Sequence, residues 1–194
     1  MREVYIILTY TGTVPSRIIK YYTKEKYSHV SIALDSGLKQ MYSFARLNPY
    51  NAFRGGLIHE EIEKGTSNRF KNTIGQVYSF KVTDEEYNKI AELVNNMYKN
   101  KKTYKFNYLG ILLVSLNKKY KRGNRFYCAE FVKYVLETSL GKKLVPEIVK
   151  PIDFLKLEGI ELIYEGLFRK YKDKNIHKEP YIIFSKELQN STNL

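Results

Sequence analysis

Residues 125–132 have the sequence Arg-Phe-Tyr-Cys-Ala-Glu-Phe-Val and contain Cys128, the single cysteine of the 194-residue chain. From Cys128 to Leu136 the apolar residues follow a helical spacing, which predicts a helix that ends near Gly141. The basic segment 118–124 before it predicts a loop. Cys128 is thus expected at a helix start, where free N–H groups and the helix dipole stabilise a thiolate and an oxyanion. The alternative is that Cys128 is a small apolar residue of the core.

The pattern outward from this helix predicts an α+β fold with several short strands and a few helices. A capping box at Thr83 and Glu86 begins an amphipathic helix, the most regular one in the chain. Shorter helices are expected at 15–23, 108–116 and 151–157, and a loop at 48–56. The expected strands are 4–10, 27–34, 38–46, 57–62, 76–82, 160–164 and 181–184.

Length and composition indicate one folded domain over residues 1–194, with a polar tail from about residue 187. One cysteine allows no intramolecular disulfide, and we find neither an export signal nor an apolar stretch long enough to span a membrane, so we expect a cytoplasmic protein. The net charge of +13 favours an anionic partner such as nucleic acid, an anionic membrane or a wall polymer, or it reflects only a lysine-rich composition. The densest basic runs are 99–105 and 118–125.

The three histidines are candidates for a general base. His29 opens a predicted strand, His59 lies on another strand beside Glu60 and Glu61, and His177 lies in a lysine-rich segment. No pair among the histidines and Cys128 has the short spacing of a structural zinc site, so we predict neither a metal nor an organic cofactor.

Three segments together resemble a known family. Residues 16–22 with 27–32 (Tyr-Ser-His-Val-Ser-Ile), the aromatic-rich stretch 104–110, and the cysteine motif at 125–132 occur in the same order in circularly permuted papain-like hydrolases. These are the bacterial YiiX-like relatives of the NlpC-type cell-wall peptidases and of lecithin retinol acyltransferase. The resemblance covers about residues 4–140 and implies a permuted papain-like fold, in which an antiparallel sheet packs against helices.

The resemblance also implies the site residues. Cys128 would be the nucleophile, its backbone amide would contribute to the oxyanion hole, and His29, 99 positions earlier (128 minus 29), would be the base. The family places a polar residue on the next strand to hold the imidazole, and the alignment puts Ser43 there. A two-residue turn at 36–37 would instead bring Gln40 and Tyr42 to the histidine's face, whereas a three-residue turn at 36–38 would favour Ser43. We expect Glu130 to complement the helix dipole, not to act in catalysis.

These observations support three hypotheses. The first is a thiol hydrolase or acyltransferase that acts on an amide or ester through an acyl-thioester, and the positive charge would suit an anionic substrate. The second is a basic, non-catalytic module in which 99–105 and 118–125 bind anionic membrane or, less favoured, nucleic acid. The third is a pseudoenzyme on the same fold. The sequence does not decide the substrate or the oligomeric state.

Overall fold

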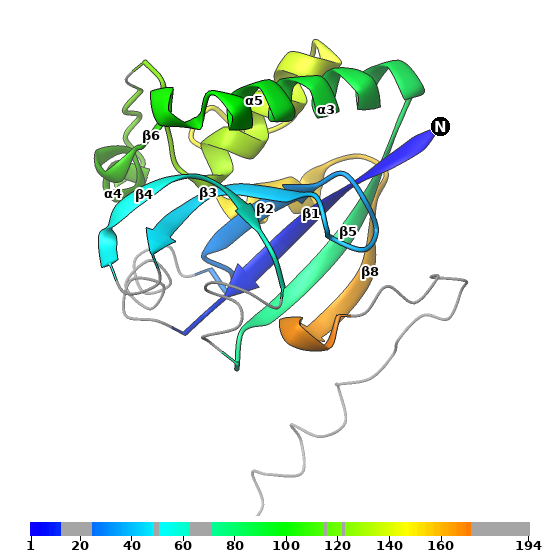
Figure 1. Ribbon diagram of the computed structural model, residues 1–194, viewed down its shortest axis with the longest axis horizontal. Coiled ribbons are helices and arrows are strands. Elements are labelled where there is room, and N and C mark those ends of the chain that lie inside the picture. Colours follow the sequence, from blue (N-terminus) through cyan, green and yellow to red (C-terminus); the bar gives the residue numbers. More distant parts are fainter. Residues whose placement is uncertain (13–24, 49–50, 63–70, 115, 122, 172–194) are drawn as a thin grey trace, which may run out of the picture.

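A single antiparallel sheet with helices on one side forms the framework of the computed structural model (Figure 1). The structure describes residues 1–12, 25–48, 51–62, 71–114, 116–121 and 123–171. Six strands follow the order β4-β3-β2-β1-β5-β8, and all of their pairings are antiparallel. The strands are β1 (Arg2–Tyr10), β2 (His29–Ala33), β3 (Met41–Asn48), β4 (Asn51–Glu60), β5 (Ile74–Val82) and β8 (Ile160–Leu167).

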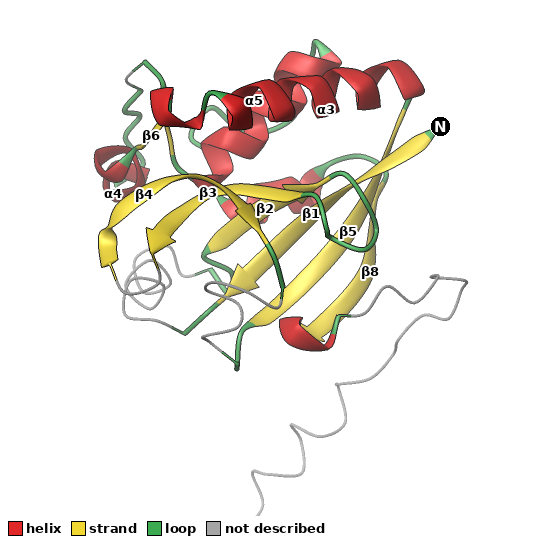
Figure 2. Ribbon diagram, viewed as in Figure 1, coloured by secondary structure: helices red, strands yellow, loops and turns green. Residues whose placement is uncertain are grey.

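The helices in the described part lie mainly over one face of this sheet (Figure 2). They are α3 (Asp84–Lys99), α4 (Tyr108–Val114), α5 (Cys128–Leu140) and the 3₁₀ turns η1 (Lys101–Thr103), η2 (Pro151–Lys156) and η3 (Phe168–Lys170). A small parallel pair, β6 (Lys105–Phe106) with β7 (Arg125–Phe126), joins the segment before α4 to the segment before α5. The α+β class with an antiparallel sheet packed against helices is therefore confirmed.

The core has two unequal parts because both faces of the sheet carry apolar residues. The larger cluster fills the space between the sheet and helices α3 and α5, and Val30, Ile32, Phe44 and Phe131 are among its fully buried members. A smaller cluster on other strand positions gathers around Phe168 of η3. The larger cluster supports both α5 and the strands beside it.

The helix signals in the sequence are confirmed where the structure describes them. Thr83 N donates to the Glu86 carboxylate at 2.8 Å and Glu86 N donates to the Thr83 hydroxyl at 3.1 Å, which is the predicted capping box of α3. Helix α5 ends at Gly141, whose φ of +67° is the left-handed conformation that glycine adopts readily. The segment 151–157 is 3₁₀ over Pro151–Lys156.

The prediction of a loop at 48–56 is wrong. Strand β3 continues to Asn48 and β4 begins at Asn51, so residues 48 and 51–56 belong to the far end of a long hairpin. Glycine and proline suggested a loop, but Gly55 lies within β4, where a Cβ would come within 2.7 Å of the Phe106 ring. The pair Gly55-Gly56 thus allows close packing on the strand and is not a turn signal.

The hairpin between β2 and β3 has the register of the three-residue turn. Ile32 pairs with Tyr42 and Ala33 with Met41, which places Asp35 opposite Lys39. Leu38 adopts a φ of +52°, the left-handed position that ends such a turn. The Asp35 carboxylate accepts hydrogen bonds from the amides of Lys39 and Gln40, at 2.9 Å and 2.6 Å.

Several sequence predictions fall outside the described residues, namely the helix at 15–23, the strand at 181–184, the tail and His177. Within the described residues, no helix is both long and apolar enough to cross a membrane.

Candidate functional site

Cys128 is the first residue of α5, directly after the short strand β7, as the sequence predicts. Its backbone amide belongs to the first turn of the helix and therefore has no intrahelical acceptor. The side chain is only 4% exposed and belongs to the larger core cluster. The thiol thus combines a helix-start position with burial.

His29, the first residue of β2, interacts with a carboxylate and with the Cys128 thiol. The Nε2 atom of His29 is 3.1 Å from the Oε1 atom of Glu60, the last residue of β4. The same Oε1 accepts a 2.7 Å hydrogen bond from the Ser31 hydroxyl, which is also 3.3 Å from Nε2 of His29. The Cys128 thiol lies near enough to the imidazole to raise the pKa of His29. The imidazole is therefore the group that the thiol and the carboxylate share.

Charge and burial oppose each other at this site. Burial of the His29 ring favours its neutral form, but the Glu60 carboxylate and Cys128 outweigh burial and raise the pKa of His29 above its usual range. Burial would likewise raise the pKa of Glu60, but the charge and hydrogen bond of His29 and the Ser31 hydroxyl lower it. With side chains 20% and 13% exposed, His29 and Glu60 form a largely buried imidazolium–carboxylate pair.

None of the three sequence candidates for the residue that orients His29 hydrogen-bonds to it in the described structure. Ser43 is fully buried, and its hydroxyl has no hydrogen-bond partner of regular geometry among the described residues, although it lies near enough to Glu60 to lower the pKa of that carboxyl. Tyr42 points into the core and packs on the rings of His59 and Tyr98, at 5.1 and 5.4 Å. Gln40 is an exposed residue of the turn after β2.

No role for Glu60 follows from the sequence pattern, in which it is only a neighbour of His59. Strand β3 lies between β2 and β4, so Glu60 reaches His29 from the next strand but one. Ser43 lies on that intervening strand, opposite Ile58 of β4, and its hydroxyl is near the Glu60 carboxylate. The available signal was a glutamate at the end of a strand that is otherwise part of a buried sheet.

A second polar cluster supports the first turn of α5. Asn107 is 1% exposed, and its Nδ2 donates to the Glu130 carboxylate at 3.0 Å and to the Tyr120 carbonyl at 3.0 Å. Glu130 also accepts from the backbone N of Tyr127 at 3.1 Å, and Asn107 Oδ1 accepts from Gly110 N at 3.0 Å. Asn107 therefore connects the start of α4 to the start of the cysteine helix.

Glycine is required beside this cluster. A Cβ at Gly110 would come within 2.2 Å of the Asn107 side chain, so no larger residue fits at this point of α4. Burial raises the pKa of Glu130, in contrast to Glu60. As the sequence predicted, Glu130 serves the helix start; it caps α5 and does not face the thiol–imidazole pair in any contact of the described residues.

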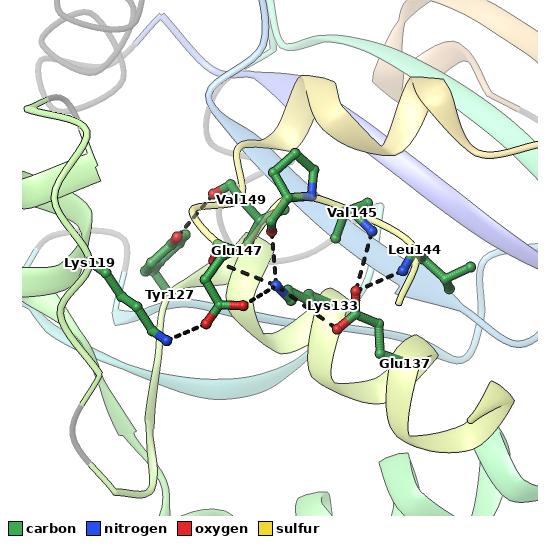
Figure 3. Close-up of polar contacts among 9 residues, drawn as sticks. Lys119, Tyr127, Lys133, Glu137, Leu144, Val145, Glu147 and Val149 are labelled. Carbon is green, nitrogen blue, oxygen red and sulfur yellow. Dashed lines mark hydrogen bonds and ion pairs between the residues drawn. The ribbon is translucent and has the colours of Figure 1, made fainter. Parts of the chain in front are cut away.

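The segment after α5, for which the sequence predicted no role, returns along that helix (Figure 3). Lys133 Nζ donates to the carbonyl of Pro146 at 2.8 Å, and the Glu137 carboxylate accepts from the amides of Leu144 and Val145 at 2.8 and 3.2 Å. The Tyr127 hydroxyl donates to the Val149 carbonyl at 2.9 Å (Figure 3). Because Tyr127 immediately precedes Cys128, this segment helps to fix the residue that caps the cysteine helix.

The remaining histidine in the described part, His59, lies away from the pair. Its Nε2 is 2.6 Å from the Lys39 carbonyl and its ring packs on Tyr42. No group of three or more histidine, cysteine, aspartate or glutamate side chains in the described ranges could hold a metal ion.

Comparisons with known proteins identify the fold and little else. No protein-family model matches the chain, and no curated protein matches it. Among solved structures, the chain is similar to the crystal structure of metalloprotein yiiX from Escherichia coli O157:H7, DUF1105, with a TM-score of 0.52 and 15% identity. The match covers 85% of this chain and 97% of that one. At this identity the likeness concerns the fold, and it agrees with the YiiX-like resemblance noted in the sequence.

Proposed function

We propose that this protein is a cysteine-dependent hydrolase or acyltransferase of permuted papain-like fold that acts on an amide or ester bond. The observation that carries the proposal is the environment of His29, whose Nε2 is 3.1 Å from the largely buried Glu60 carboxylate and whose pKa the Cys128 thiol also raises. A nucleophile, a base and a group that orients the base are the parts that covalent acyl transfer needs, and geometry defines them whatever their order in the chain.

In the first half of the reaction, the proton of the Cys128 thiol resides on His29, as the raised pKa of that imidazole favours, and the thiolate sulphur forms a bond to the acyl carbon. The carbonyl oxygen becomes an oxyanion, to which the backbone amide of Cys128, which has no intrahelical acceptor, would donate. His29 then gives its proton to the leaving amine or alkoxide as the bond to the acyl carbon breaks, which leaves an acyl-thioester on Cys128.

In the second half, water or another acceptor attacks the thioester while His29 takes the acceptor's proton and returns it to the sulphur. Glu60 is a positioning residue in this scheme. Its contact with Nε2 orients the ring and stabilises the imidazolium after each proton transfer. No step requires a metal or an organic cofactor.

The test is the pH dependence of Cys128 alkylation by iodoacetamide in the folded full-length protein. We expect the wild-type thiol to react at or below neutral pH, and His29→Ala to remove that reactivity because the thiol then loses its base. His59→Ala is the matched control, since it removes another histidine of the same sheet, one whose Nε2 lies 2.6 Å from the Lys39 carbonyl and whose ring packs on Tyr42.

Acyl transfer itself is then detected by mass spectrometry as an acyl adduct on Cys128 after incubation with activated esters. A thiol that stays inert until the protein unfolds, or that reacts equally well without His29, would show that Cys128 is a core residue and would overturn the proposal.

A further inference from the structure

All charged side chains in the segment from residue 99 to residue 127 are basic. It contains no aspartate or glutamate and nine lysine or arginine residues: Lys99, Lys101, Lys102, Lys105, Lys118, Lys119, Lys121, Arg122 and Arg125. Both basic runs of the sequence lie in it, one on each side of α4. The strong positive charge of the chain is therefore concentrated around this helix.

Helix α4 presents apolar side chains to solvent in the middle of that segment. Tyr108, Leu109 and Leu112 are 41%, 45% and 60% exposed, and Leu116, just beyond the helix, is 61% exposed. These four are half of the eight large hydrophobic residues that are exposed in the described structure. Gly110 and Val114 are the buried residues of the helix, so α4 packs by one side and leaves its leucines uncovered.

Exposed lysines precede and follow these apolar residues in the chain. Lys105, Lys118 and Lys121 are exposed and form no ion pair within the described residues, whereas Lys119 is paired with Glu147. We call the four apolar residues and these three lysines the α4 patch. Helix α4 lies at the end of the molecule beside β4 and β6, and β8 is the strand at the opposite edge of the sheet (Figure 1).

We propose that the α4 patch docks the protein onto the surface of an anionic phospholipid bilayer. Exposed leucines that insert at the boundary between headgroups and acyl chains, with lysines around them at the level of the phosphates, are the two components of an interfacial membrane site. Charge complementarity favours a lipid surface as the partner. The segment contains no aspartate or glutamate, and its three patch lysines form no ion pair within the described residues, so they are available to anionic headgroups.

A nucleic acid would use the lysines and leave the leucines without a role, because its backbone is recognised through charge and its bases by stacking on aromatic rings. The same leucines would suit a second copy of the chain, but two such patches facing each other would bring like charges together. Docking would also bring the cysteine helix near the bilayer, because Asn107 connects α4 to Glu130 in the first turn of α5. The proposal rests on this surface alone and does not depend on a reactive Cys128.

The experiment is co-sedimentation of the full chain with sucrose-loaded vesicles of phosphatidylcholine containing about 30% phosphatidylglycerol, compared with pure phosphatidylcholine. We expect binding to the anionic vesicles only, weakened as the salt concentration rises from about 0.1 to 0.5 M because screening shortens the range of the charges. The double variant Lys118→Glu/Lys121→Glu should bind at least about 25-fold more weakly, since each surface lysine contributes about fivefold.

The leucines distinguish insertion from simple charge attraction. Leu112→Ser/Leu116→Ser should weaken binding by about tenfold or more, because each leucine that inserts into the bilayer removes roughly half of its apolar surface from water. Leu162→Ser on β8, an exposed leucine at the opposite edge of the sheet (47% exposed), and Lys170→Glu in η3, which follows β8, should leave binding unchanged. Circular dichroism and thermal melts confirm that each variant is folded.

Three results would overturn the proposal. They are equal binding to neutral and anionic vesicles, membrane binding that is insensitive to the leucine variant, and a concentration-dependent dimer that the leucine variant abolishes. Tighter binding to a short RNA or DNA than to vesicles, insensitive to the leucines, would assign the patch to nucleic acid instead. Cys128→Ser should bind vesicles like the wild type, so failure of docking and failure of the catalytic proposal are separate results.

Discussion

Two buried carboxylates flank the candidate site, and the difference between them shows how a protein sets the charge of a glutamate. Glu60 lies against the imidazole of His29, and Glu130 lies against the amide of Asn107. Burial acts on both in the same direction, but the pKa of Glu60 is lowered and that of Glu130 is raised. The partner explains the difference, because a cation offsets the cost of burying an anion and a neutral amide offsets only part of it.

The two clusters therefore suit different purposes. An ionised Glu60 keeps His29 protonated and oriented, which matters for proton transfer. Glu130 with Asn107 satisfies backbone donors at a helix start, which matters for the shape of the site. The same residue type serves chemistry in one region and architecture in the other.

The largest expected difference between the two regions is in reactivity. Glu60→Gln removes the charge that favours the imidazolium, and we expect Cys128 alkylation at pH 6–7 to slow by about 100-fold, the lower range of a general acid–base contribution. Glu130→Gln keeps a side chain of the same shape beside Asn107 and the Tyr127 amide. It should alter the rate of alkylation by less than about threefold, within the small effects usual for neutral replacements. The measurement is the initial rate of iodoacetamide labelling followed by intact mass.

If the two substitutions acted only by disturbing the structure, both would slow alkylation to the same extent. Equal losses of alkylation rate would therefore contradict the separate roles of Glu60 and Glu130. NMR of His29 gives a second readout. Its pKa should fall in Glu60→Gln and stay in place in Glu130→Gln.

A smaller difference should appear in the pH dependence of stability. The raised pKa of His29 contributes stability that is full below the unfolded value of about 6.5 and is lost as pH rises through the folded value. The lowered pKa of Glu60 contributes stability that is full above about 4.3 and is lost as pH falls. The pair should therefore stabilise the fold most between about pH 4.5 and 6.5, by about 1–3 kcal/mol, the range of hydrogen bonds to charged groups.

Glu130 should show the opposite trend. Because its pKa is raised, the wild type should lose stability relative to Glu130→Gln as pH rises above about 4.3, whereas the stability that Glu60 contributes relative to Glu60→Gln is already complete there and is lost as pH falls below about 4.3. Urea unfolding followed by circular dichroism between pH 3 and 8 measures both. Parallel profiles for the two variants would mean that the partners do not set the two charges.

The smallest effect is expected at Ser43, the residue that the family alignment favoured for orienting His29. Ser43→Ala removes a buried hydroxyl that has no regular hydrogen bond in the described structure, so we expect a change in unfolding free energy within about 0.5 kcal/mol and nearly unchanged labelling of Cys128. Ser43→Leu should resemble Glu60→Gln, because a larger side chain at this fully buried position near the Glu60 carboxylate would displace the carboxylate from His29. If Ser43→Ala slowed labelling as much as Glu60→Gln does, Ser43 would be the orienting residue after all.

The sequence by itself determined the local features of this protein. The helix that begins at Cys128, the capping box at Thr83 and the strand that begins near His29 follow from hydrophobic period, capping residues and β-branched runs, all of which act between near neighbours in the chain. The order of the motifs likewise indicated a YiiX-like α+β fold, which the structural comparison supports.

Only the tertiary structure decided which groups meet. The two possible turns after β2 differ by one residue in the register of β3. The sequence Ser-Gly-Leu is compatible with both, and the left-handed conformation of Leu38 in the structure shows which one forms. Glu60 reaches His29 across an intervening strand, and Asn107 reaches Glu130 across 23 positions of chain. Such pairs are invisible to periodicity, because sheet order and side-chain reach, not spacing along the chain, bring them together.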